Sequence, residues 1–264
     1  MVVRPYEMID MLWQPPSTRV GRIHRFEKLD RNLPENSKYY GHWGYTIYRT
    51  HYSPESDKQW DTLLDSLRRQ TMLAVGYYQD VAFEDELMHQ RADLLPKKWY
   101  YQSQKEYSDD IKRIKDLFHL DVRDDSSLDG LGVHEIRELC IRDRPEEKEA
   151  MAGHQFNFVL LVDREVFEAM ERGEFVVKAV SYNWRDGLNN WGWMRIPTGY
   201  LLELWHSLMG RDDDYHKVLS FDGPEEELEE YTWSGGWDTA ATSECSEIRK
   251  GIHYSSQQWP RNRA

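Results

Sequence analysis

The stretch Trp43-Gly44-Tyr45-Thr46-Ile47-Tyr48-Arg49-Thr50 decides the fold. It is rich in aromatic and β-branched residues, and alternate side chains of an extended chain point to opposite faces of a sheet. Ser53-Pro54 follows at once, with a serine suited to capping a helix and a proline suited to its first turn. The segment therefore predicts a strand over 43–50 that leads directly into a helix.

The predicted helix after Ser53 carries an apolar stripe. Trp60, Leu63, Leu64 and Leu67 recur at helical spacing. One face of this helix is therefore expected to pack on the sheet that contains the first strand.

A second stretch, Trp191 to Tyr200, repeats features of the first. Both read Trp-Gly-aromatic, then four residues, then Thr-x-Tyr, and each precedes an amphipathic helix; here Thr198 is the expected cap. Strand-to-helix joints of this kind are where mixed folds place side chains that touch ligands. The repeat fits either an internal duplication or a chance match.

The middle of the chain reads as mainly helical and acidic. We expect helices over 83–95, 109–118 and 131–142, with Ser108 as the cap of the second, and an acidic loop over 121–132. The second half predicts a buried strand over 156–162, a helix from Asp163 to Arg172, a strand over 174–184 and its hairpin partner over 191–196.

This order of elements predicts an α+β fold with a mostly antiparallel sheet of about four strands and helices on one face. The expected arrangement is ferredoxin-like with a helical insertion. We expect one domain over 41–210 with the insert at about 77–148. An irregular N-terminal arm over 1–40 precedes it, and an acidic, largely irregular tail over 211–264 follows it.

Composition limits the classes of partner. The formal net charge is −13, from 47 acidic and 34 basic residues, which opposes binding to nucleic acid phosphates. The longest apolar run is too short to cross a bilayer. The two cysteines, Cys140 and Cys245, lie far apart, which is typical of reduced thiols. We therefore expect a cytoplasmic protein with neither a nucleic acid nor a membrane as partner.

Motifs for common cofactors are absent from the sequence. No glycine-rich phosphate loop occurs, and His134-Glu135 opens a helical zinc motif in which Glu138 replaces the second histidine. Acidic clusters over 121–129 and 212–216 could hold a divalent ion, but solvated loops explain them more simply. We expect no cofactor and no metal.

The candidate binding site lies at the two joints. Arg49 and Arg195 are charges in otherwise apolar strands, and a buried arginine needs a carboxylate partner. That partner is either internal, with Asp57, Asp61 or Glu203 in reach, or a ligand anion. In the second case the site residues are Arg49, His51, Tyr52, Trp193, Arg195, Thr198 and Tyr200.

The segments over 43–60 and 193–200 resemble a widespread family of uncharacterised proteins from filamentous fungi. The resemblance covers roughly residues 40 to 210. It implies a fungal intracellular protein, and it brings no activity and no catalytic residues.

The 11 tryptophans and 16 tyrosines suit a layered core, a pocket for a flat ligand or a contact surface. We expect a domain that recognises a small molecule or a protein through an aromatic-rich surface. The alternative is an enzyme of secondary metabolism type, in which His51 or Tyr52 moves a proton and Arg195 holds a carboxylate. A metal-dependent enzyme that uses the acidic loops ranks third.

Overall fold

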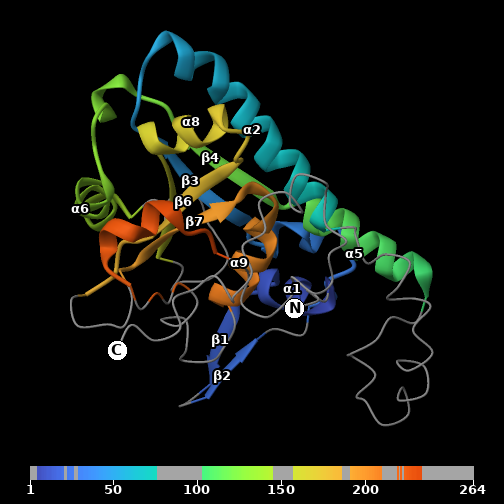
Figure 1. The fold of residues 1–264 in the computed structure, drawn as a ribbon. Helices are drawn as coiled ribbons and strands as arrows, with labels where there is room; N and C mark the ends of the chain where they lie inside the picture. Colours follow the sequence, from blue (N-terminus) through green and yellow to red (C-terminus); the bar gives the residue numbers. More distant parts are fainter. Residues whose placement is uncertain are drawn as a thin grey trace.

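A computed structural model describes residues 5–20, 23–26, 29–75, 103–144, 157–185, 191–209, 219, 221 and 223–233. Within this part of the chain, five strands form one mixed sheet (Figure 1). Their spatial order is β4 (Phe118–Arg123), β3 (Trp43–Arg49), β5 (Phe158–Val162), β6 (Val176–Ser181) and β7 (Trp193–Pro197). β4, β3 and β5 run parallel, whereas β6 is antiparallel to β5 and to β7.

The α+β class predicted from the sequence is confirmed, but the finer prediction is wrong. The sheet has five strands rather than about four, and its first three strands are parallel rather than antiparallel. A ferredoxin-like arrangement does not describe it. β3 and β5 pair in parallel because long connections with helices join them, and parallel neighbours need such crossovers.

The strand that sequence reasoning missed is β4. Helix α5 (Gln104–Asp116) begins after the cap Ser103 instead of Ser108, and it ends before Phe118. Residues 118–123 then alternate between apolar and polar side chains, as an edge strand does. Part of the predicted acidic loop over 121–132 is thus strand, and the predicted helix over 83–95 lies outside the described residues.

One face of the sheet carries most of the helices. The indole N–H of Trp43 donates to the carbonyl of Ile114 in α5 at 2.7 Å. The hydroxyl of Tyr45 donates to the carbonyl of Leu201 in α9 (Leu201–Met209) at 3.1 Å. Helices α2 (Pro54–Ala74) and α8 (Arg164–Glu171) pack on each other on this same face.

The opposite face is also covered, contrary to the prediction of helices on one face only. Tyr48, the neighbour of Ile47 along β3, lies against Cys140 of α6 (Val133–Asp143), and its pKa is raised by burial and by Cys140. The 3-10 helix η5 (Glu225–Glu230) lies on this face as well, over β6 and β7. Figure 1 shows α6 and α2 on opposite sides of the sheet.

The helix α2 forms as its sequence predicts. The Ser53 hydroxyl accepts a hydrogen bond from the amide of Ser56 at 3.1 Å, and the Ser56 hydroxyl accepts one from the amide of Ser53 at 2.8 Å. The short 3-10 helix η4 (Thr198–Tyr200) precedes α9. Thr198 does not cap that helix; its hydroxyl donates to the side-chain oxygen of Gln70 in α2 at 2.8 Å.

The predicted arm and tail contain regular elements. Residues 1–40 hold helix α1 (Pro5–Leu12), the hairpin of β1 (Ser17–Val20) and β2 (Ile23–Phe26), and the 3-10 helix η1 (Pro34–Tyr39). Ile9 of α1 and Leu228 of η5 are both fully buried in the one large core. Helix α1 and η5 therefore belong to the folded domain, and residues 234–264 lie outside the described part.

Gly44 lies where β3 and β4 approach most closely. Its φ is +135°, and a methyl group added there would lie 1.8 Å from the carbonyl oxygen of His119 in β4. Only a glycine fits this position, because both the backbone conformation and the lack of space exclude a side chain.

The substitution Gly44→Ala should therefore lower the free energy of unfolding by more than about 3 kcal/mol, because strain and a backbone clash add. Gly173→Ala is the matched control, since Gly173 also has a positive φ of +83° but open space around it. It should cost about 1 kcal/mol. Urea unfolding followed by tryptophan fluorescence measures both values, and equal losses would contradict the close approach of β3 and β4.

Candidate functional site

The three parallel strands end at one edge of the sheet, which we call the carboxyl edge. The connection that follows β3 enters α2 on one face, whereas the connection that follows β4 leads to α6 on the other face. The strand order also reverses at β3, because the chain places β4 on one side of it and then β5 on the other. In open sheets with parallel strands, ligands bind outside the carboxyl ends at such a reversal.

Direct bonds join the two connections at this edge. The amide of Gly130 donates to the carbonyl of Thr50 at 2.9 Å, and the amide of Tyr52 donates to the Asp129 carboxylate at 3.2 Å. The Arg49 guanidinium lies 3.6 Å from the Asp124 carboxylate. The carboxyl edge is therefore one continuous surface formed by both connections.

Arg49 is the central group of this surface. Its side chain is only 5% exposed, and its Nε donates to the carbonyl of His51 at 3.0 Å. One terminal nitrogen binds the Ser56 hydroxyl at 3.0 Å and the Asp57 carboxylate, and the rings of Tyr52 and Trp60 lie 4.4 and 5.6 Å from the guanidinium carbon. Arg49 is therefore paired internally with Asp57, and each of its three guanidinium nitrogens has a partner: the His51 carbonyl, Ser56 with Asp57, or Asp124.

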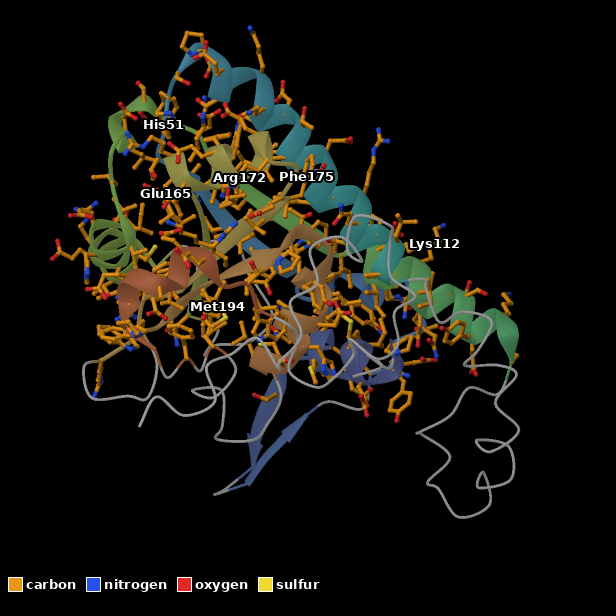
Figure 2. All side chains as sticks on the ribbon, in the orientation of Figure 1. His51, Lys112, Glu165, Arg172, Phe175 and Met194 are labelled. Carbon is orange, nitrogen blue, oxygen red and sulfur yellow. The ribbon has the colours of Figure 1, made fainter. Side chains whose placement is uncertain are left out.

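Tyr52 and His51 border this arginine. The Tyr52 hydroxyl donates to the carbonyl of Arg49 at 3.2 Å, and burial together with Asp124 raises the pKa of Tyr52 to about 12. Tyr52 therefore keeps its proton near neutral pH and cannot act there as a base. The His51 ring lies 6.1 Å from the ring of Phe167 in α8. Figure 2 shows His51 and Glu165 at the same end of the sheet.

Arg195 lies on the other face of the sheet. Tyr48, Leu161, Lys178 and Arg195 are successive cross-strand neighbours, so they share the face of α6 and η5. Arg195 binds the Glu174 carboxylate at 2.8 Å and the carbonyl of Glu229. The prediction of an internal partner holds for Arg195, but Glu174 was not among the three carboxylates named as candidates.

The structure does not assemble the predicted pocket. Arg49, His51 and Tyr52 lie together at the carboxyl edge, but Trp193 shares the face of Arg195 in β7, which β5 and β6 separate from β3. The remaining two residues have local partners: Thr198 contacts Gln70, and the Tyr200 ring lies 6.0 Å from the ring of Trp233.

A second charged centre surrounds Lys178, and sequence reasoning did not identify it. The ammonium lies 2.5 Å from Asp163 and 3.7 Å from Glu165, and it also binds Glu229. These three carboxylates have oxygens within 4.8 Å of one another, the spacing of a cation site, and the ammonium binds all three. The sequence contains one feature that could have revealed this centre: Lys178 is a single charge within the apolar run 176–180. A charge in an apolar strand is also what identified Arg195.

Two of the carboxylates around the Lys178 ammonium, Asp163 and Glu165, have pKa values shifted in opposite directions. Burial raises the pKa of Asp163 to about 6, although Lys178 opposes this change. For Glu165, which is more exposed, burial is outweighed by its own backbone hydrogen bond and by Lys178, so its pKa is lowered. Burial also opposes the charge of Lys178, but Asp163 and Glu229 outweigh it and raise the lysine pKa.

Comparison of the chain with protein-family models, with curated proteins and with solved structures finds no match. None of the helices in the described part of the chain is long and apolar enough to cross a membrane.

The two acidities around Lys178 predict opposite pH effects. The pKa of Asp163 is raised on folding, so the folded protein binds its proton more tightly. Stability relative to Asp163→Asn should therefore fall by about 2 kcal/mol as pH rises from 4 to 6. Glu165 has a lowered pKa, so stability relative to Glu165→Gln should instead rise over this range. Urea unfolding at pH 4, 5 and 6 measures both differences; a flat or rising difference for Asp163→Asn would contradict the buried acid.

Proposed function

We propose that the protein is a recognition domain that binds a positively charged small molecule or protein segment at the carboxyl edge. The observation that carries the proposal is a set of partly exposed carboxylates around the point where the strand order reverses. The exposed fractions of their side chains are 63% for Asp57, 37% for Asp124 and 45% for Glu165.

These carboxylates are held in place before any ligand arrives. Asp57 and Asp124 share the buried Arg49, and Asp129 accepts the amide of Tyr52. The Ser127 amide and hydroxyl lower the pKa of the exposed Asp125, which keeps this carboxyl ionised. Fixed carboxylates reduce the ordering cost of binding a cation, and a net charge of −13 attracts cations over longer distances.

The aromatic residues contribute differently from the prediction. Trp43, Trp60 and Trp205 are at most 4% exposed and pack in the core, so a flat tryptophan surface is not part of the proposal. The rings that border the carboxyl edge are His51 and Tyr52, which are half-buried. Such rings can pack against a bound cation while the carboxylates balance its charge.

The enzyme alternative has less support. It requires one pocket that combines Arg195 with His51 or Tyr52. These two residues lie at the carboxyl edge beside Arg49, whereas Arg195 lies on the other face of the sheet. Membership in the filamentous-fungal family, with an intracellular location, remains part of the proposal on the strength of the two resembling segments alone.

The test is a thermal-shift titration at low salt with spermidine and an oligolysine peptide. Both should raise the melting temperature, because they bind the folded state, and 0.5 M NaCl should remove the effect. Citrate and an oligoglutamate peptide should have no effect. The isosteric triple variant Asp124→Asn, Asp129→Asn and Glu165→Gln should lose the shift, since it removes charge but keeps the shape of the edge.

The matched control removes three charges elsewhere, at Asp65 of α2 and at Glu106 and Asp116 of α5, which are exposed and distant from the carboxyl edge. It should retain at least half of the shift. The proposed binding site is wrong if both triple variants lose the rise in melting temperature to the same extent. It is also wrong if neither spermidine nor oligolysine raises the melting temperature of the wild type.

A further inference from the structure

Residues 223–233 of the chain cover the face of β6 and β7 through η5 and reach the outer edge of the sheet at Thr232 and Trp233. β7 is the last strand of the sheet, and Thr232 forms a parallel bridge with Arg195 in that strand. The amide of Trp233 donates to the carbonyl of Arg195 at 2.7 Å. The end of the segment therefore pairs with the edge of β7, the backbone contact by which bound peptides also join a receptor sheet.

Side chains of β6 and β7 bind two carboxylates of this segment. The indole N–H of Trp193 donates to the Glu225 carboxylate at 2.8 Å, and the Lys178 ammonium binds the Glu229 carboxylate. Arg195 adds a bond to the backbone carbonyl of Glu229. Two acidic side chains four residues apart are thus held by a cation and an aromatic donor.

Apolar residues anchor the same segment. Leu228, which immediately precedes Glu229, is fully buried in the core. Trp233 is 4% exposed, and its ring lies 6.0 Å from the ring of Tyr200. Buried anchors next to paired charges are the usual composition of a peptide-binding site.

The groups that bind the segment keep other partners. Lys178 also contacts Asp163 and Glu165, and Arg195 also contacts Glu174. If residues 223–233 left this face, neither cation would lose all its carboxylates, so the penalty for an unpaired buried charge would be avoided. Departure of the segment would then free the Trp193 indole N–H and one carboxylate position beside Lys178, while both cations kept their remaining carboxylates.

We propose that this face of β6 and β7 is a binding site for an acidic peptide of a partner protein, and that residues 223–233 occupy it as an intramolecular competitor. The peptide carries two carboxylates four residues apart, at the positions of Glu225 and Glu229, with an apolar residue just before the second. The site lies on the opposite face from Arg49, and it adjoins the carboxyl edge at Glu165, which also contacts Lys178. The test below therefore leaves the carboxylates of that edge unchanged.

The test uses the full chain and a fluorescein-labelled synthetic peptide with the sequence of residues 223–233, followed by fluorescence anisotropy. The double variant Glu225→Gln and Glu229→Gln weakens the intramolecular segment but leaves Lys178, Trp193 and Arg195 unchanged. It should bind the peptide at least tenfold more tightly than the wild type does, because the competitor is weaker. A peptide with glutamine at the same two positions should not bind.

The matched control is Glu226→Gln with Glu230→Gln, which removes the same charge at the same spacing from two exposed residues. It should bind the peptide as the wild type does. Trp193→Phe added to the first double variant removes the indole donor and should reduce binding severalfold. If the first double variant fails to fold, Glu225→Gln alone, which affects only the bond to Trp193, should still tighten binding about threefold.

Equal peptide affinities for the wild type and both double variants would overturn the proposal, as would equal gains in both double variants. Size-exclusion chromatography of the first double variant at several concentrations identifies the remaining occupant. A dimer that excludes the labelled peptide would mean that the segment of a second copy occupies the site, and this result would also overturn the proposal of a partner peptide.

Discussion

The burial of β3 between two parallel neighbours is the constraint on which the rest of the structure depends. All seven residues of this strand are buried, with β4 on one side and β5 on the other. A strand that is covered on both faces must find partners for its polar side chains as well as for its backbone. Its last residue, Arg49, meets this requirement through His51, Ser56 and the two carboxylates of Asp57 and Asp124.

The same arrangement separates the two charged centres. Alternate residues of β3 face α2 and α6, and the cross-strand register carries this alternation through β5 and β6 to β7. Arg49 therefore belongs to the face of α2, whereas Lys178 and Arg195 belong to the face of α6 and η5. One face presents carboxylates at the carboxyl edge, and the other binds carboxylates that residues 223–233 supply. The two surfaces favour ligands of opposite charge.

Local patterns in the sequence predicted β3 and α2, and they placed Asp57 among three candidate partners of Arg49, because each of these features depends on residues close together in the chain. Contacts between distant residues were not predictable in this way. β4 was missed because its alternation is short and its residues are mostly half-exposed. The predicted pocket was wrong for a geometric reason: a shift of one position along a strand reverses the face, and the sequence alone does not specify which strands are neighbours.

The most direct test of the account is the set of nuclear Overhauser effects between backbone protons of β3 and those of its neighbours. Parallel pairing in the register described here predicts contacts between Tyr45 and Leu120 and between Ile47 and Leu160, since paired strands lie about 4.8 Å apart. Contacts that join β3 directly to Trp193 of β7, or an antiparallel pattern between β3 and β4, would contradict the central position of β3 and with it both proposed surfaces.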